Sequence, residues 1–168
     1  MSTDAGVCGG IVNRDNCRLL GLVFHDIIYA YQKTVRETLG NCDKAILNLV
    51  ECMCQNTSLS QLCESEAGFE ELVSFMARKL REMGLGELTL EKIGGEDYLL
   101  RIDSCVWADT YHPQLKSHEV TCPWTLIAMA VYQIKENRRV HVADSEFTPR
   151  GSITKIQPAS KIVFSLVG

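Results

Sequence analysis

The hydrophobic residues in the first half of the chain recur every three or four positions. Over residues 17–39 the apolar positions are Leu20, Val23, Phe24, Ile27, Ile28, Tyr31, Val35 and Leu39. This spacing matches the turn of an α-helix and predicts a long amphipathic helix with a wide apolar face. The same period predicts two more helices, over residues 44–54 and 69–83, and Gly84 is a suitable C-cap for the second. Residues 1–16 lack this pattern and are expected to form a flexible lead.

From residue 87 the spacing changes to an alternation of polar and apolar residues, which is typical of a half-buried strand. Strands are expected over residues 87–91, 98–107, 139–144 and 152–156, with 162–167 as a fifth strand or an extended tail. Gly94-Gly95 predicts a hairpin turn between the first two strands. A further helix is expected over 124–137, capped by Thr121 or Cys122 and opened by Pro123, because proline is favoured at the first helical position.

This order of elements, a run of helices followed mainly by strands, predicts an α+β fold. In such a fold the N-terminal helices pack on a mainly antiparallel sheet. The 168 residues suffice for one domain with a substantial core and are too few for two. We therefore expect a single domain over residues 17–168, preceded by the lead over residues 1–16.

Composition and charge exclude some classes of function. The net charge of −4 leaves no broad basic surface to neutralise phosphates, so general nucleic-acid binding is not expected. No apolar run approaches the roughly 20 residues of a membrane span, and the N-terminus lacks the features of a signal peptide. The protein is therefore expected to be cytoplasmic. In that compartment its eight cysteines would be reduced, and they would be buried, bind a metal or take part in redox chemistry.

Residues that carry chemistry concentrate between Cys105 and Trp124, which hold two of the four histidines and both tryptophans. Two thiols and two imidazoles are ligands that a tetrahedral zinc ion prefers. They are supplied by Cys105, His112, His118 and Cys122. A thiol at a helix N-terminus has a lowered pKa, which favours the thiolate that zinc binds. The alternative is that both cysteines are buried and both histidines lie in an exposed loop.

The aromatic residues of this segment are candidates for a ligand pocket. Trp107, Tyr111 and Trp124 lie close to the loop, and aromatic rings bury a large area and orient apolar ligands. The alternative is ordinary core packing. His25 lies on the apolar face of the first helix, where it is either a haem ligand or a hydrogen-bonded core residue.

Thiol chemistry is a further alternative. Cys122 stands at a helix start with His118 nearby, as an activated nucleophile requires, yet no third orienting residue is evident. Cys52, Cys54 and Cys63 either form a second metal or redox cluster or lie separately in the core and at the surface. No glycine-rich phosphate-binding loop supports nucleotide binding.

Three short motifs resemble those of the 4-vinyl-reductase-like domain. They are Thr121-Cys122-Pro123-Trp124 at a helix start, Arg139-Val-His-Val-Ala-Asp-Ser-Glu146 on a strand, and Gly151-Ser152-Ile-Thr-Lys-Ile156 after a turn. That family is related in fold to the small subunits of the TRAPP vesicle-tethering complex, and the resemblance covers residues 17–160. It implies a homodimer that holds a small hydrophobic molecule between helices and sheet, and it implies no clear enzymatic activity.

Members of the family that sense aromatic compounds carry a zinc site beside this pocket. The resemblance places the helix-start cysteine of that site at Cys122 and its acidic ligand at Asp144. Phe147 stands where a strand cysteine would be, and Thr154 or Lys155 where the last cysteine would be. Two of the four ligands implied by the resemblance are therefore missing.

These observations favour a small hydrophobic-ligand binding or sensing module that is cytoplasmic, homodimeric and without catalysis of its own. Its ligand would contact Trp107, Tyr111 and Trp124, and its long first helix would supply the dimer face. One alternative is a metal- or thiol-dependent enzyme acting on a tetrapyrrole or a similar ligand, with zinc as its cofactor. The other is an assembly subunit like those of the TRAPP complex.

Overall fold

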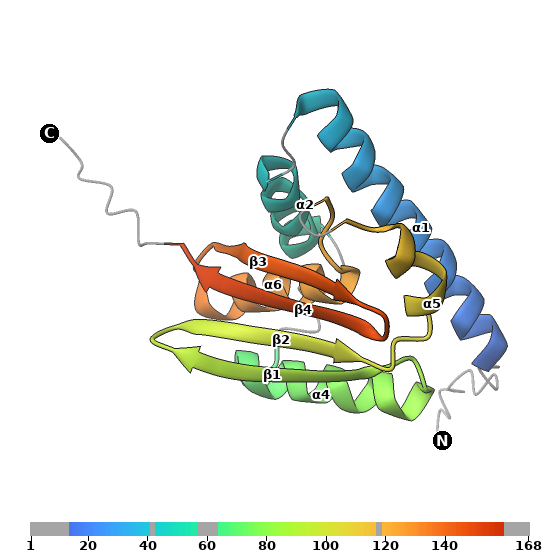
Figure 1. Cartoon of the computed structure of the whole chain (residues 1–168). Coiled ribbons are helices and arrows are strands. Elements are labelled where there is room, and N and C mark those ends of the chain that lie inside the picture. Colours follow the sequence, from blue (N-terminus) through green and yellow to red (C-terminus); the bar gives the residue numbers. More distant parts are fainter. Residues whose placement is uncertain (1–13, 41–42, 57–63, 117–118, 160–168) are drawn as a thin grey trace, which may run out of the picture.

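The structure is a computed structural model that describes residues 14–40, 43–56, 64–116 and 119–159. This part of the chain forms an α+β fold (Figure 1), which confirms the predicted class. The helices are α1 (Arg14–Leu39), α2 (Asp43–Asn56), α4 (Phe69–Met83), α5 (Ala108–Tyr111), the 3-10 helix η1 (His112–Gln114) and α6 (Pro123–Glu136). The strands are β1 (Glu87–Gly94), β2 (Asp97–Asp103), β3 (Val140–Thr148) and β4 (Gly151–Pro158). The strand or tail predicted over 162–167 and most of the predicted lead lie outside the described residues.

The four strands form an antiparallel sheet in the order β1-β2-β4-β3. The β1–β2 hairpin turns at the predicted glycine pair, where Gly95 adopts the left-handed conformation with φ of 52°. Leu100 lies at the centre of the sheet, opposite Leu90 on one side and Thr154 on the other. Figure 1 shows α4 and α6 on one face of the sheet, with the other face free of the described helices.

The core is centred on α6, which is apolar on nearly every side. Its buried residues are Pro123, Thr125, Leu126, Ala128, Met129, Ala130, Val131 and Tyr132. A helix with apolar residues on all sides is expected to lie between two layers. α6 does so, since it contacts α2 and α4 as well as the sheet, where the fully buried Leu100 and Ile156 face the helical layer.

The helix over 69–83 and its C-cap are confirmed, whereas the strand predicted over 98–107 is too long. β2 ends at Asp103, and Ser104 takes the left-handed conformation with φ of 51°. The backbone N–H groups of the next residues then bond outside the sheet, from Cys105 to the Arg150 carbonyl and from Val106 to the Leu85 carbonyl. The apolar pattern continued past the strand because this loop is buried, and burial alone does not distinguish a strand from a packed loop.

α1 lies obliquely across one end of the molecule beside α2 and α5 (Figure 1). Its outward face carries four exposed apolar residues, spaced by three or four positions, which we call the α1 stripe. They are Leu20, Val23, Ile27 and Tyr31, with exposed fractions of 70%, 45%, 61% and 43%. Among the residues that the structure describes, no helix has both the length and the apolar character required to cross a membrane.

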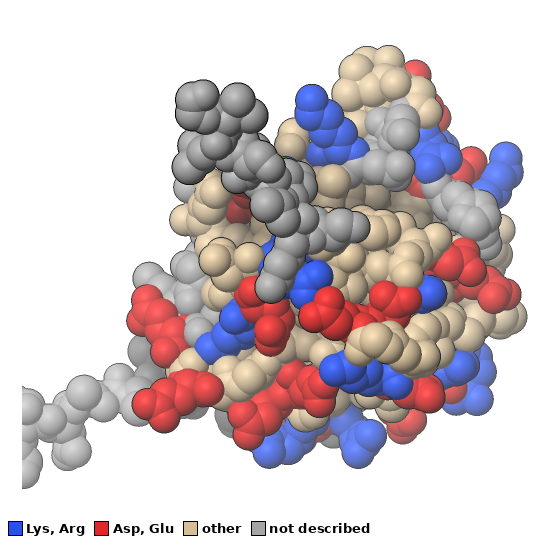
Figure 2. All heavy atoms as spheres, turned by 90° about the vertical axis from the view of Figure 1, so that its left-hand side faces the viewer, with Lys and Arg blue, Asp and Glu red and all other residues tan. Residues whose placement is uncertain are grey.

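The surface carries charges of both signs. On the face drawn in Figure 2, acidic and basic side chains are interspersed, and the basic ones do not gather into a continuous patch. That face therefore lacks the extended positive charge that would attract a polyanion.

Candidate functional site

The segment that follows β2 meets the inner face of α1, and Gly21 is where the two approach most closely. A Cβ atom placed on residue 21 would lie 2.6 Å from Cη2 of Trp107 and nearer still to Cζ2, inside the 3.0 Å limit that real Cβ contacts respect. Only glycine therefore allows α1 to rest on this indole ring. As a result Trp107 is 1% exposed.

Four rings form one cluster beneath α1, which we call the aromatic cluster. Its members are His25 on α1, Trp107 before α5, Tyr111 at the end of α5 and Trp124 in the first turn of α6. The His25 ring centroid lies 4.2 Å from that of Trp107, 5.9 Å from that of Trp124 and 6.4 Å from that of Tyr111. The two indole rings are 5.8 Å apart. The structure thus brings together the three residues that the sequence suggested for a ligand pocket, and it adds His25.

Two polar contacts hold α1 over the cluster. Gln32 is 1% exposed; its Nε2 donates to the Thr121 carbonyl at 2.9 Å, and its Oε1 accepts from the Thr121 N–H at 2.7 Å. Nearer the solvent, the Tyr111 hydroxyl donates to Oδ1 of Asp26 at 2.6 Å. Both contacts join α1 to the segment between β2 and α6, so the position of α1 determines whether the cluster is covered.

Gln32 and Gly21 are the residues that sequence reasoning missed. Gln32 lies four positions after Ile28 and three before Val35, so it falls on the apolar stripe of the helix. A polar residue at such a position needs a buried hydrogen-bonding partner, and this is the signal that could have identified it. Gly21 has a similar signal, since a glycine inside a helix costs stability unless close packing requires it.

A small cavity remains beside the cluster. Its volume is about 20 Å³, which is room for about one water molecule. Its walls are His25, Tyr29, Gln32, Tyr111, His112, Leu115, Val120, Thr121, Cys122, Pro123 and Phe147. Tyr111 and His25 border this cavity, whereas the two tryptophans contact His25 and are not part of its wall. A molecule larger than water would therefore need α1 to shift outward.

Both histidines of the site are held in the neutral form. Burial lowers the pKa of His25 below its ordinary value of 6.5, although its hydrogen bond to the Gly21 carbonyl opposes the shift. Because a carbonyl only accepts, His25 Nδ1, at 2.9 Å, carries the proton and Nε2 keeps its lone pair. Burial also lowers the pKa of His112, whose Nδ1 donates to the Thr148 carbonyl at 2.7 Å.

The two thiols of the segment are buried and protonated. Burial raises the pKa of the Cys105 thiol to about 11, and it raises the pKa of Cys122 as well, against the opposing effect of neighbouring polar groups. We expected the start of α6 to lower the pKa of Cys122, but loss of water around the thiol outweighs that effect. A neutral thiol is a poor nucleophile, so this closed arrangement does not favour thiol catalysis.

Three of the four residues suggested as zinc ligands are described, and His118 lies outside the described residues. Cys122 and His112 border the same cavity, and Cys105 is close enough to Cys122 that two ionised thiols would repel each other. Within residues 14–40, 43–56, 64–116 and 119–159, no three His, Cys, Asp or Glu side chains group in a way that could hold a metal ion.

The other ligand candidates lie apart. Asp144, at the acidic position that the resemblance implies, is exposed on β3 opposite Lys155. In the second cysteine cluster, Cys54 donates to the Ala130 carbonyl at 3.4 Å and Cys52 is exposed, while Cys63 lies outside the described residues.

The buried histidines predict a pH dependence of stability. An unfolded histidine titrates near pH 6.5, and burial lowers the pKa of His25 in the folded chain, so this ring binds a proton more weakly there. The neutral His25 ring therefore makes its full contribution to the free energy of unfolding above about pH 6.5. This contribution is lost as the pH falls below that value. One histidine contributes a slope of at most about 1.4 kcal/mol per pH unit.

Chemical unfolding between pH 8 and pH 5 measures this slope, and His25→Phe is expected to reduce it while keeping a ring in the cluster. Ala30→Gly, at an exposed position of α1, changes stability without removing a titrating group; it is the control and should leave the slope unchanged. An identical pH dependence in wild type and His25→Phe would show that His25 is not the group responsible.

Comparisons with known proteins identify no family for this chain. No protein-family model matches the chain, and neither the curated proteins nor the solved structures contain a match.

Proposed function

We propose that the protein binds a small hydrophobic molecule between α1 and the aromatic cluster. The observation that carries this proposal is the cluster, in which His25, Tyr111 and the only two tryptophans of the chain gather beneath one helix. Sites for small apolar ligands are typically lined by aromatic side chains with a few polar groups that orient the ligand. Here Nε2 of His25, which keeps its lone pair, and the Tyr111 hydroxyl would supply the polar groups.

Binding would require an outward movement of α1. The present cavity of about 20 Å³ is far smaller than the roughly 300 Å³ or more of a ligand pocket. Breaking the Tyr111–Asp26 hydrogen bond and lifting Gly21 from Trp107 would open space along the inner face of the helix. A ligand that binds only this open form would increase its population, and the displaced helix would transmit the binding event. The proposal includes no catalytic step.

We also propose that the α1 stripe contacts a second copy of the chain. Its four residues follow the three-four spacing by which neighbouring turns of a helix form one continuous face. An apolar stripe of this kind on a helix surface is typical of contact with another helix. Since the opposite face of α1 covers the aromatic cluster, ligand binding would alter the contact between the two copies.

Ile27→Glu is expected to convert the homodimer into monomers, because it places a charge at the centre of the α1 stripe. Ile27 is 61% exposed in the single chain, so folding should be unaffected. Sedimentation velocity measures the change, with Lys33→Glu on an exposed position of the same helix as the control. A wild-type chain that is monomeric at all concentrations would contradict the homodimer. A stable complex formed only with a different subunit would favour the assembly-subunit alternative.

Intrinsic fluorescence tests the ligand proposal, because both tryptophans belong to the aromatic cluster. Titrations with naphthalene and with decanoate compare an aromatic with an aliphatic molecule. We expect a saturable shift of tryptophan emission with one of them, weakened in His25→Leu, which removes a ring and a polar group of the site. The shift should be unchanged in Lys33→Ser, at an exposed position of α1. No shift with either molecule, together with no small molecule in a solvent extract of the purified protein, would count against the proposal.

Elemental analysis of the same untagged protein tests the zinc alternative. About one zinc per chain, absent in Cys122→Ser, would assign the segment to a metal site and require the ion to deprotonate two buried thiols. The absence of zinc from the wild-type protein would leave both thiols in the core.

A further inference from the structure

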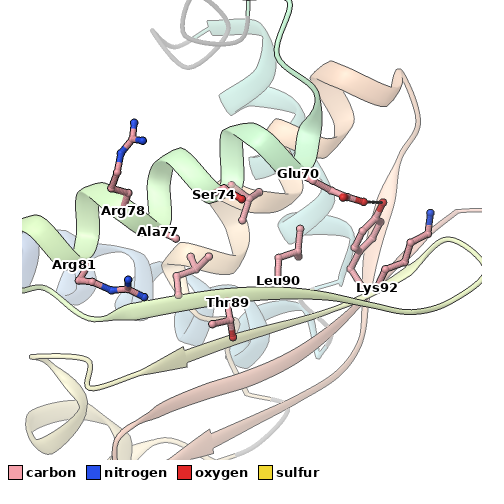
Figure 3. Close-up of a pocket in the computed structure, with 11 residues that line it drawn as sticks. Glu70, Ser74, Ala77, Arg78, Arg81, Thr89, Leu90 and Lys92 are labelled. Atoms are coloured by element: carbon pink, nitrogen blue, oxygen red, sulfur yellow. Dashed lines mark hydrogen bonds between the residues drawn. The ribbon is translucent and has the colours of Figure 1, made fainter.

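A groove of about 500 Å³ runs between α4 and β1, apart from the aromatic cluster (Figure 3). Its floor is apolar and is formed by Val73, Ala77, Leu88 and Leu90. Val73 and Leu88 are buried, whereas Ala77 and Leu90 are half-buried, so the floor offers apolar surface that a side chain from outside can cover.

The groove opens beside an unpaired sheet edge. β1 pairs with β2 on one side, and no strand in the described part of the chain pairs with its other side. An edge strand exposes a row of backbone N–H and C=O groups that can pair with one more strand. An extended segment placed there could form these hydrogen bonds and direct alternate side chains toward the floor of the groove.

The available charge at the groove is positive, although the chain as a whole carries −4. Figure 3 shows Arg81 extending from α4 toward β1 and Lys92 at the opposite end of the groove. Neither forms an ion pair with a carboxylate in the described part of the chain. Glu70, the acidic residue of the lining, accepts a hydrogen bond from the Tyr98 hydroxyl at 3.2 Å. Both cations can therefore pair with carboxylates of a partner, and Nζ of Lys92 also lies 5.7 Å from the centroid of the Tyr98 ring.

We propose that the α4–β1 groove binds an acidic, extended segment of a partner protein, which joins the sheet as a strand beside β1. Backbone hydrogen bonds to the strand edge would provide affinity. Apolar side chains at every second position would cover the floor, and Asp or Glu residues at the ends would pair with Arg81 and Lys92. Charge complementarity favours an acidic segment over a basic or neutral one.

The test is selection of random decapeptides displayed on phage against the immobilised full-length chain, followed by fluorescence anisotropy with the selected peptides. We expect enrichment of peptides with at least two acidic residues and apolar residues at alternate positions. Their affinity should fall roughly tenfold or more in Arg81→Glu/Lys92→Glu. It should also fall in Ser74→Trp, which fills the groove without changing its charge. Lys33→Glu/Lys44→Glu, which changes the net charge equally on α1 and α2, should bind like wild type.

Hydrogen exchange gives an independent measurement, since the amides of β1 should exchange more slowly with a selected peptide bound. Three results would overturn the proposal. The first is that no peptide is enriched, and the second is that the enriched peptides lack acidic residues or bind the charge-reversed variant equally well. The third is a concentration-dependent dimer of the chain that the charge reversal abolishes, which would assign the groove to a second copy.

Discussion

Gly21→Ala is expected to destabilise the fold by roughly 2 kcal/mol, although helix propensity alone predicts the opposite sign. Alanine in a helix interior is favoured over glycine by about 1 kcal/mol. The added Cβ, however, would overlap the six-membered ring of Trp107, which is 1% exposed. Overpacking of a core typically costs about 1–3 kcal/mol, and the extent of this overlap places it at the upper end.

Urea unfolding measures the loss, and tryptophan emission should shift to longer wavelength as α1 lifts from the ring. Ala30→Gly, on the exposed side of the same helix, calibrates the propensity effect. Trp107→Phe removes the overlapping ring atoms, so the double variant should be more stable than the sum of the two single changes predicts. An alanine variant more stable than wild type would mean that α1 does not rest on Trp107.

Gln32→Leu is expected to cost about 2–4 kcal/mol, because it leaves both the N–H and the carbonyl of Thr121 buried without a partner. Each buried backbone group that loses its hydrogen bond costs about 1–3 kcal/mol, and leucine returns part of that by filling the volume. Gln55→Leu, at an exposed position of α2, is the matched control and should change stability by less than about 0.5 kcal/mol.

Hydrogen exchange at the Thr121 amide separates a local effect from a global one. In wild type this amide donates to Gln32 at 2.7 Å and should be protected, whereas in Gln32→Leu it should exchange faster than amides in the core of α6. An amide that remains protected in the variant, with stability changed by less than about 1 kcal/mol, would show that another group can replace Gln32. Gln32→Leu should also bind apolar ligands more readily, because α1 would separate more easily from the aromatic cluster.

The spacing of apolar residues along the chain determined the helices, the strands and the class of fold, because each element depends on contacts within a few residues. The three-four period predicted α1 and α4, and the alternation over residues 87–91 predicted β1, which extends to Gly94 in the structure. Pro123 marked the first residue of α6, since proline loses nothing where the helix has no earlier carbonyl to bond. The order of these elements was then sufficient to predict helices against an antiparallel sheet.

Only the tertiary structure determined where the segment after β2 packs. Ser104 redirects the chain by a left-handed conformation that no residue pattern required, and Trp107 consequently packs beneath α1 instead of in the sheet. The contact with Gly21 spans more than eighty positions, as does the pairing of Gln32 with Thr121. Sequence spacing reports which side of an element is apolar, but not which distant residue will cover it. The sequence therefore indicated which residues could form a site, whereas long-range packing determined that four rings meet beneath α1 and that a groove remains beside β1.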